Sequence, residues 1–335
     1  MNAADDPRFD PIESIDLIRR LPGISDADLP FHGKHRIKEH LMRETAWEAY
    51  PAPARSRRRL ILLAAVGAAT CAAILAVTLG VSGSNEHLAV AQTEPAAVQL
   101  LDRAALAAQA APAPTVRDGQ FLYTKTAGHS TSLSETANGG MAAAATDESA
   151  ERWVSVDGSD GTVTRTARGT STDPAGGKGK ANINGPTYRF LEGLSTDPDR
   201  LLETIYADAR LNHGEGSGST TGPDQEAFVA IGDLLRTVEA PPGVSAALYR
   251  AAARIPGVVL VPQATDAIGR PGVAVARVHN GERTEWIFDT VSMRLLGERT
   301  VLLKDSAWGK AGAPVTSVAI VARGVVDKAG QVPGQ

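Results

Sequence analysis

Residues 272–289, GVAVARVHNGERTEWIFD, decide the fold class of this chain of 335 residues. Two runs rich in β-branched and aromatic residues flank Asn280-Gly281, which is the strongest short signal for a two-residue hairpin turn. The stretch therefore predicts two antiparallel strands joined by a tight turn.

Three further strand patterns lie on either side of this hairpin, at residues 258–261, 295–303 and 315–322. The links between them are short, whereas parallel neighbours would need long crossover connections. An antiparallel meander is therefore expected. Because helical patterns precede it, the fold class is α+β, with a curved antiparallel sheet packed on helices.

The helical patterns begin at Pro95 and return at residues 197–206, 224–238 and 244–254. Asp197 is placed to cap the second of these helices, and Pro198 occupies its first position. A strand at 119–126 and a hairpin at 151–168 are expected between the first two helices.

Three stretches rich in Gly, Ser, Thr or Ala contain few large apolar residues. Such stretches predict flexible loops, here near 127–150, 169–186 and 211–223. With these loops, residues 95–335 are expected to form one domain, preceded by a linker at 82–94.

Further toward the N-terminus, Leu60–Val81 reads LILLAAVGAATCAAILAVTLGV and carries no charge. As a helix it would be about 33 Å long, close to the ~30 Å hydrocarbon core of a bilayer. The stretch predicts one transmembrane helix. A signal cleaved after Ala91 is the alternative, because Ala89-Val90-Ala91 has the small-x-small form of a cleavage site.

The basic residues flanking this run indicate its orientation. Arg55, Arg57, Arg58 and Arg59 stand just before it, and the next basic residue is Arg103. By the positive-inside rule, residues 1–59 are cytoplasmic and residues 82–335 lie outside the plasma membrane of a single-pass protein.

Residues 1–59 contain two short amphipathic patterns, and Ile37 and Leu41 share one face of the second. Helices this short bury little surface when isolated, so the segment is expected to stay flexible or to fold on a partner. Ile37 and Leu41 are the candidate partner-binding residues.

Composition and motifs point away from several function classes. The formal net charge is −4, so no nucleic-acid partner is expected. The only cysteine, Cys71, lies inside the apolar run and leaves no disulfide for the outer part. The chain has no nucleophile elbow, P-loop or H-E-x-x-H motif. We therefore expect no catalytic residue, no cofactor and no metal.

Isolated histidines and carboxylates do not change this expectation. The cytoplasmic histidines lack the cysteines that would complete a zinc site, and the outer histidines stand alone in the sequence. Asp197 and Asp199 are best explained by helix capping. The outer tryptophans are expected to be core or sheet-face residues. The cytoplasmic histidines are His32, His35 and His40, the outer histidines are His129, His213 and His279, and the outer tryptophans are Trp153, Trp286 and Trp308.

Several stretches together resemble an uncharacterised actinobacterial family of single-span membrane proteins: ISDADLP at 24–30, EHLM at 39–42, GQFLY at 119–123, LSTDP at 194–198, PDQEAFVAIGDLL from 223, residues 244–257, GERTEWIFD at 281–289 and LGERT at 296–300. The family has no assigned activity, but association with extracytoplasmic-function sigma factors is implied by the resemblance. The order of helix, Pro-Gly turn and meander is also similar to the lipoprotein-carrier fold of LolA and the MucB periplasmic regulators.

Two function classes follow. The first is a membrane-anchored, non-enzymatic, anti-sigma-like regulator that couples the outer domain to a cytoplasmic partner, for which a sigma factor is the candidate. The second is a membrane-tethered protein whose outer domain binds a lipid or another apolar ligand. An enzyme is a distant third.

Overall fold

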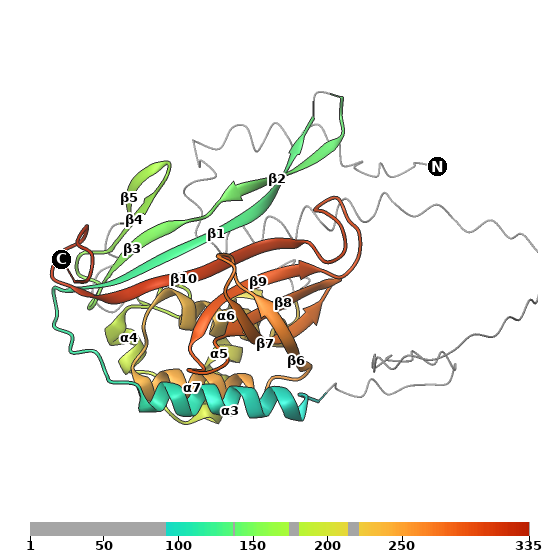
Figure 1. Ribbon diagram of the computed structural model, residues 1–335. Coiled ribbons are helices and arrows are strands. Elements are labelled where there is room, and N and C mark those ends of the chain that lie inside the picture. The colour runs from blue at the N-terminus through green and yellow to red at the C-terminus, as the bar shows by residue number, and fades with distance from the viewer. Residues whose placement is uncertain (1–91, 137, 174–180, 214–220, 335) are drawn as a thin grey trace, which may run out of the picture. The chain divides into compact units, whose positions relative to one another are not determined.

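A computed structural model of the chain (Figure 1) describes residues 92–136, 138–173, 181–213 and 221–334. These residues belong to one compact unit, Val90–Gln335. Its class is α+β, as predicted. The helices are α3 (Pro95–Ala110), α4 (Tyr188–Glu192), α5 (Pro198–His213), α6 (Pro223–Thr237) and α7 (Pro242–Ala252).

The strands form a single antiparallel sheet. They are β1 (Phe121–Glu135), β2 (Met141–Asp147), β3 (Ala150–Ser155), β4 (Thr162–Thr166), β5 (Gly169–Asp173), β6 (Val258–Thr265), β7 (Pro271–His279), β8 (Glu282–Phe288), β9 (Leu295–Leu302) and β10 (Pro314–Val326). Their order is β5-β4-β3-β1-β10-β9-β8-β7-β6, and β2 pairs with the far half of β1. The first strand of the domain thus pairs with the last.

The meander and its hairpin turn agree with the sequence prediction. Asn280 and Gly281 both have positive φ, 49° and 79°, and they join β7 to β8 with His279 paired to Glu282. A two-residue turn of this kind matches the right-handed twist of the flanking strands. The predicted hairpin at 151–168 is also confirmed, as the pair β3 and β4.

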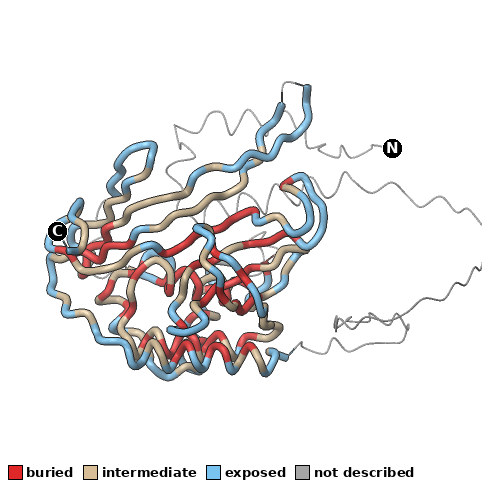
Figure 2. The backbone as a smooth tube through the Cα atoms, viewed as in Figure 1, coloured by how far each residue is buried: buried red, intermediate tan, exposed pale blue. Residues whose placement is uncertain are grey.

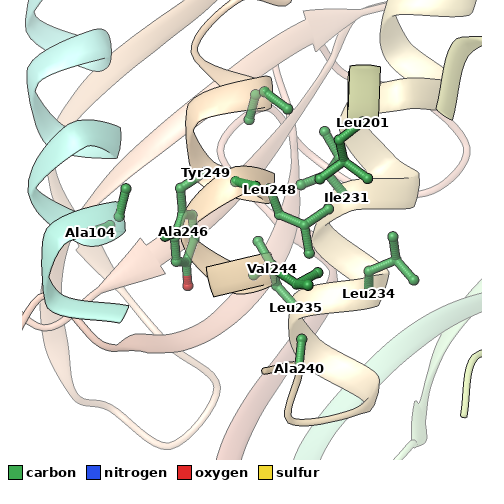
Figure 3. Packing of buried hydrophobic residues seen from close by; sticks show 14 of the residues in the cluster. Ala104, Leu201, Ile231, Leu234, Leu235, Ala240, Val244, Ala246, Leu248 and Tyr249 are labelled. Carbon is green, nitrogen blue, oxygen red and sulfur yellow. The ribbon is translucent and has the colours of Figure 1, made fainter. Parts of the chain in front are cut away.

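The helices lie against one face of the curved sheet (Figure 1). Alternate residues of each strand point toward them, so Trp286 and Phe288 join the main core while Ile287 faces the other way. α3, α5, α6 and α7 meet through small and branched side chains (Figure 3). Each buried Leu, Val or Ile in this core contributes about 1.5–3 kcal/mol.

The ladder shifts register at four places, and two of these irregularities lie near Arg270. Leu296 is the extra residue where β9 pairs with β8, and Val321 is the extra residue where β10 pairs with β1. Arg270 lies close to both, because its guanidinium donates to the carbonyl oxygens of Leu296 and Ile320, each at 2.9 Å. One arginine therefore ties two irregular strands together.

Residues 127–150 are not the loop that their composition predicts. β1 continues to Glu135 and β2 follows, and the two strands form a ribbon whose residues are largely exposed (Figure 2). Residues 169–173 also form a strand. In both places backbone pairing supplies the order, and neither face is buried enough to leave a hydrophobic period in the sequence.

Other expectations are confirmed or lie beyond the described residues. The second expected helix begins with the predicted cap, since Asp197 Oδ1 accepts the N–H groups of Asp199 and Arg200 at 3.0 Å each. Residues 174–180 and 214–220 of two expected loops are outside the described residues, as are residues 1–59 and the apolar run 60–81. α4 is an additional short helix that the sequence pattern did not indicate.

Candidate functional site: helix α6 against the sheet

Helix α6 crosses the face of the sheet on which the helices lie. Pro223 follows its N-cap Gly222, acidic residues occupy its first turn and Arg236 its last. This arrangement suits the helix dipole, which is positive at its N-terminus and negative at its C-terminus. The apolar face of α6, including Phe228 and Ile231, is fully buried.

Arg277 on β7 fastens the N-terminal turn of α6. Its guanidinium donates to Gln225 Oε1 at 3.0 Å and forms an ion pair with Asp224 at 3.5 Å. Gln225 in turn donates to Thr284 Oγ1 on β8 at 3.2 Å, and Asp224 accepts the Tyr206 hydroxyl of α5 at 2.8 Å. These polar groups thus join the first turn of α6 to the sheet and to α5.

In the middle of α6, Gly232 allows the helix backbone to approach the sheet closely. A Cβ atom at this position would lie 2.5 Å from Trp286 Nε1 and 2.8 Å from Glu298 Oε2. Phe228, one turn earlier, stacks on the Trp286 ring at 4.0 Å between centroids and 7° between planes. The contact therefore depends on glycine.

At the C-terminal end of α6, charged side chains are buried beside Leu234 and Leu235. Arg323 on β10 donates to the carbonyl oxygens of Leu235 and Arg236, the second at 2.9 Å. Thr124 Oγ1 on β1 donates to Thr237 O at 3.3 Å. These groups satisfy helix carbonyls that have no partner within the helix, and Arg323 also complements the dipole.

Asp233 and Arg236 form an ion pair whose side chains are only 6% and 11% exposed. Burial opposes the charge of Arg236, but Asp233 and Glu298 outweigh it and raise the pKa of Arg236. Burial lowers the pKa of Arg323. If only part of the contact between α6 and the sheet opened, some of these charges would stay buried without partners. We therefore expect α6 to separate from the sheet as a whole.

The start of the domain is also fastened to the sheet. Thr93 Oγ1 donates to Ile255 O at 2.5 Å, and Glu94 N donates to Val258 O at 2.9 Å. The Glu94 carboxylate accepts Leu260 N at 2.8 Å along the free edge of β6. The residues just before α3 are therefore held at three points.

This arrangement brings charges together but places no reactive group among them. Within the described ranges, no cluster of three His, Cys, Asp or Glu residues is suited to hold a metal ion. His129 lies in β1, His213 ends α5 and His279 ends β7, so the structure does not bring them together. Trp153, Trp286 and Trp308 are buried, as expected.

The site residues predicted from the sequence are not among those described. Arg55, Arg57, Arg58 and Arg59, as well as Ile37 and Leu41, precede residue 92. In the part of the chain that the structure does describe, no helix is long and apolar enough to cross a membrane.

The charged contact at α6 was missed by sequence reasoning. Asp233 interrupts the apolar run AFVAIGDLL, and Glu298 interrupts the strand LLGERTVL. A charge inside a strongly apolar element is the one available signal for a buried ion pair. It does not reveal that the Asp233–Arg236 pair of α6 lies beside Glu298 of β9, because the helix and the strand are far apart in the sequence.

Compared with protein-family models, with curated proteins and with solved structures, the chain shows no match.

Proposed function

We propose that this protein is a membrane-anchored, non-enzymatic regulator, in which residues 60–81 span the plasma membrane and residues 1–59 hold a cytoplasmic partner. The candidate partner is a sigma factor, in line with the resemblance to single-span proteins associated with such factors. The outer domain, residues 95–335, would respond to a condition outside the membrane.

The observation that carries this proposal is that the residues just before α3 are hydrogen-bonded to the outer domain. A protein that is only tethered needs a flexible linker, and its domain should be indifferent to the chain before it. Here Thr93 and Glu94 are bonded to β6 and to the turn before it, and α3 packs directly on α7. A change in the domain core would therefore displace the chain that leads to the span.

The contact beneath the sheet favours the regulator over a lipid carrier. A pocket for an apolar ligand needs a mostly apolar lining. Beside its apolar contacts, α6 meets the sheet through Arg236, Glu298 and Arg323 in its C-terminal half and through Arg277 in its N-terminal half. Opening this contact for a lipid would expose buried charges to an apolar ligand.

The partner is tested by capture of the host cell's sigma factors on residues 1–59. Leu41→Asp places a charge on the predicted apolar face and should abolish capture. Ala46→Asp makes the same charge change away from that face and should leave capture intact. Failure of the wild-type segment to retain any sigma factor would remove this partner.

Coupling is tested in the full chain with a reporter gene dependent on the captured sigma factor. Glu94→Ala removes the carboxylate that holds Leu260 N and should uncouple the reporter from the outer domain. Glu203→Ala on the exposed side of α5 is the control. A reporter unaffected by Glu94→Ala, together with lipid bound to the outer domain in native mass spectrometry, would favour the binding protein instead.

A further inference from the structure

The face of the sheet away from the helices carries a separate buried cluster of four residues, three of which are aromatic. Phe121 and Tyr123 of β1, Trp153 of β3 and Val326 of β10 form it, and all four are at most 8% exposed. We call these four residues the outer aromatic cluster. Strand alternation separates them from the main core, since the residues between them, such as Leu122 and Val154, point toward the helices.

The cluster is covered by the chain's own residues 328–334, which follow β10. Trp153 Nε1 donates to Gln331 O at 2.6 Å. Ala329 and Val332 pack against the cluster. Pro333 lies over Gly324, where an added Cβ would come within 2.5 Å of Pro333 Cγ. The segment is thus held by a hydrogen bond from Trp153 to its backbone, by apolar contacts of Ala329 and Val332, and by the contact of Pro333 with Gly324.

Charged and aromatic side chains beside the cluster restrict the orientation of Trp153. The Arg165 guanidinium lies 4.7 Å from the centre of the Trp153 ring. Glu151 accepts from Arg165 at 3.2 Å and from the Tyr123 hydroxyl at 2.7 Å. The Tyr123 and Trp153 rings are 5.4 Å apart. These contacts and the hydrogen bond to Gln331 O hold the Trp153 ring in its orientation.

The covering segment is held lightly compared with the rest of the domain. Gly330, Gln331 and Gly334 are exposed, and the apolar residues of the segment are only half-buried. Among the described residues, Trp153 provides the one side-chain hydrogen bond from the cluster to this segment. An aromatic surface with an indole donor for a peptide carbonyl, next to a glycine that accommodates a proline, has the chemistry of a peptide-binding site.

We propose that the outer aromatic cluster is a binding site for a peptide segment of the type Gln-Val-Pro-Gly, and that the chain's own residues 328–334 fill it in cis. When this segment leaves, the site takes a segment of the same chemistry from another chain. A ligand tethered by a short connection acts at an effective concentration of about millimolar, so the cis segment competes strongly. This inference does not depend on the proposed regulatory role.

The test measures binding of a fluorescent synthetic peptide, KAGQVPGQ, to the full chain and to a variant that stops after Asp327. Fluorescence anisotropy should show binding at least tenfold tighter for the shortened variant than for the full chain. Trp153→Phe in the shortened variant should weaken binding at least tenfold, because it removes the indole donor. Trp308→Phe, which changes a tryptophan outside the cluster, is the matched control.

Three results would overturn the site: no binding to the folded shortened variant, equal affinity of that variant and the full chain, or binding unaffected by Trp153→Phe. Circular dichroism checks that the shortened variant is folded. If it is not, Val332→Asp in the full chain weakens the cis segment in place, and the same titration then decides. A scrambled peptide that binds as tightly as KAGQVPGQ would also count against the site.

Discussion

Replacing Arg270 by glutamine should destabilise the domain by about 2–4 kcal/mol, because this side chain connects two β-bulges. Its Nε donates to Asp266 Oδ2 at 2.6 Å, and its Nη2 donates to the carbonyl oxygens of Leu296 and Ile320. Both carbonyls lie at or beside an extra residue in a strand, where ladder pairing is disrupted. Glutamine is too short to reach all three acceptors.

The magnitude follows from the bonds lost and from their exposure. A hydrogen bond to a charged group contributes about 1.5–3 kcal/mol when buried. Three such bonds would exceed the predicted loss, but the Arg270 side chain is 36% exposed and water replaces part of each. Asp266 keeps two backbone partners, Ile268 N and Arg270 N, so its buried carboxylate is not left bare.

The loss of unfolding free energy is measured by urea denaturation of residues 90–335, with tryptophan fluorescence as the signal. Arg117→Gln is the matched control, since its ion pair with Asp327 is 72% and 67% exposed and should contribute less than about 1 kcal/mol. Hydrogen exchange should also speed up around the two bulges in the Arg270 variant. Equal unfolding free energies for Arg270→Gln and Arg117→Gln would refute the reasoning.

Three further outcomes are expected. Gly232→Ala should lower the unfolding free energy by about 1–3 kcal/mol in urea denaturation, because its Cβ would lie 2.5 Å from Trp286 Nε1 and α6 would have to move. The N–H groups of Arg200 and Asp199 lower the pKa of Asp197. Its stabilising effect should be present above about pH 4 and disappear as the pH falls through that lowered pKa, and Asp197→Asn should remove this dependence in thermal melts. Burial and the hydrogen bond to Glu151 raise the pKa of Tyr123 to about 12. Stability should therefore fall between about pH 10 and pH 12, and Tyr123→Phe should flatten this fall when denaturation is measured across that range.

Local patterns were enough to predict most elements of the domain. The Asn280-Gly281 turn, the cap at Asp197 and the proline that begins α5 depend on backbone preferences of a few neighbouring residues. Such preferences act before tertiary contacts form, so they can be read from the sequence. The α+β class follows from them, because strands with short links must pair antiparallel.

The ribbon of β1 and β2 shows where local patterns fail. Its residues are mostly Ala, Ser and Thr, which by composition indicate a loop, and β2 is almost entirely exposed. The strands exist because β1 is already held by β10 and β3, and this pairing extends the ladder along residues that have no buried face. The order comes from a distant partner strand.

The sequence by itself was enough to predict a span at 60–81, its orientation from the arginines before it, the helices and the meander. Each of these predictions depends only on residues that are neighbours in the chain. The tertiary structure alone decided that β1 pairs with β10, that Arg323 meets the end of α6, and that Trp153 meets Gln331. Each of these contacts joins residues separated by tens to hundreds of positions. Their geometry comes from packing of the whole domain, which no short window of sequence contains.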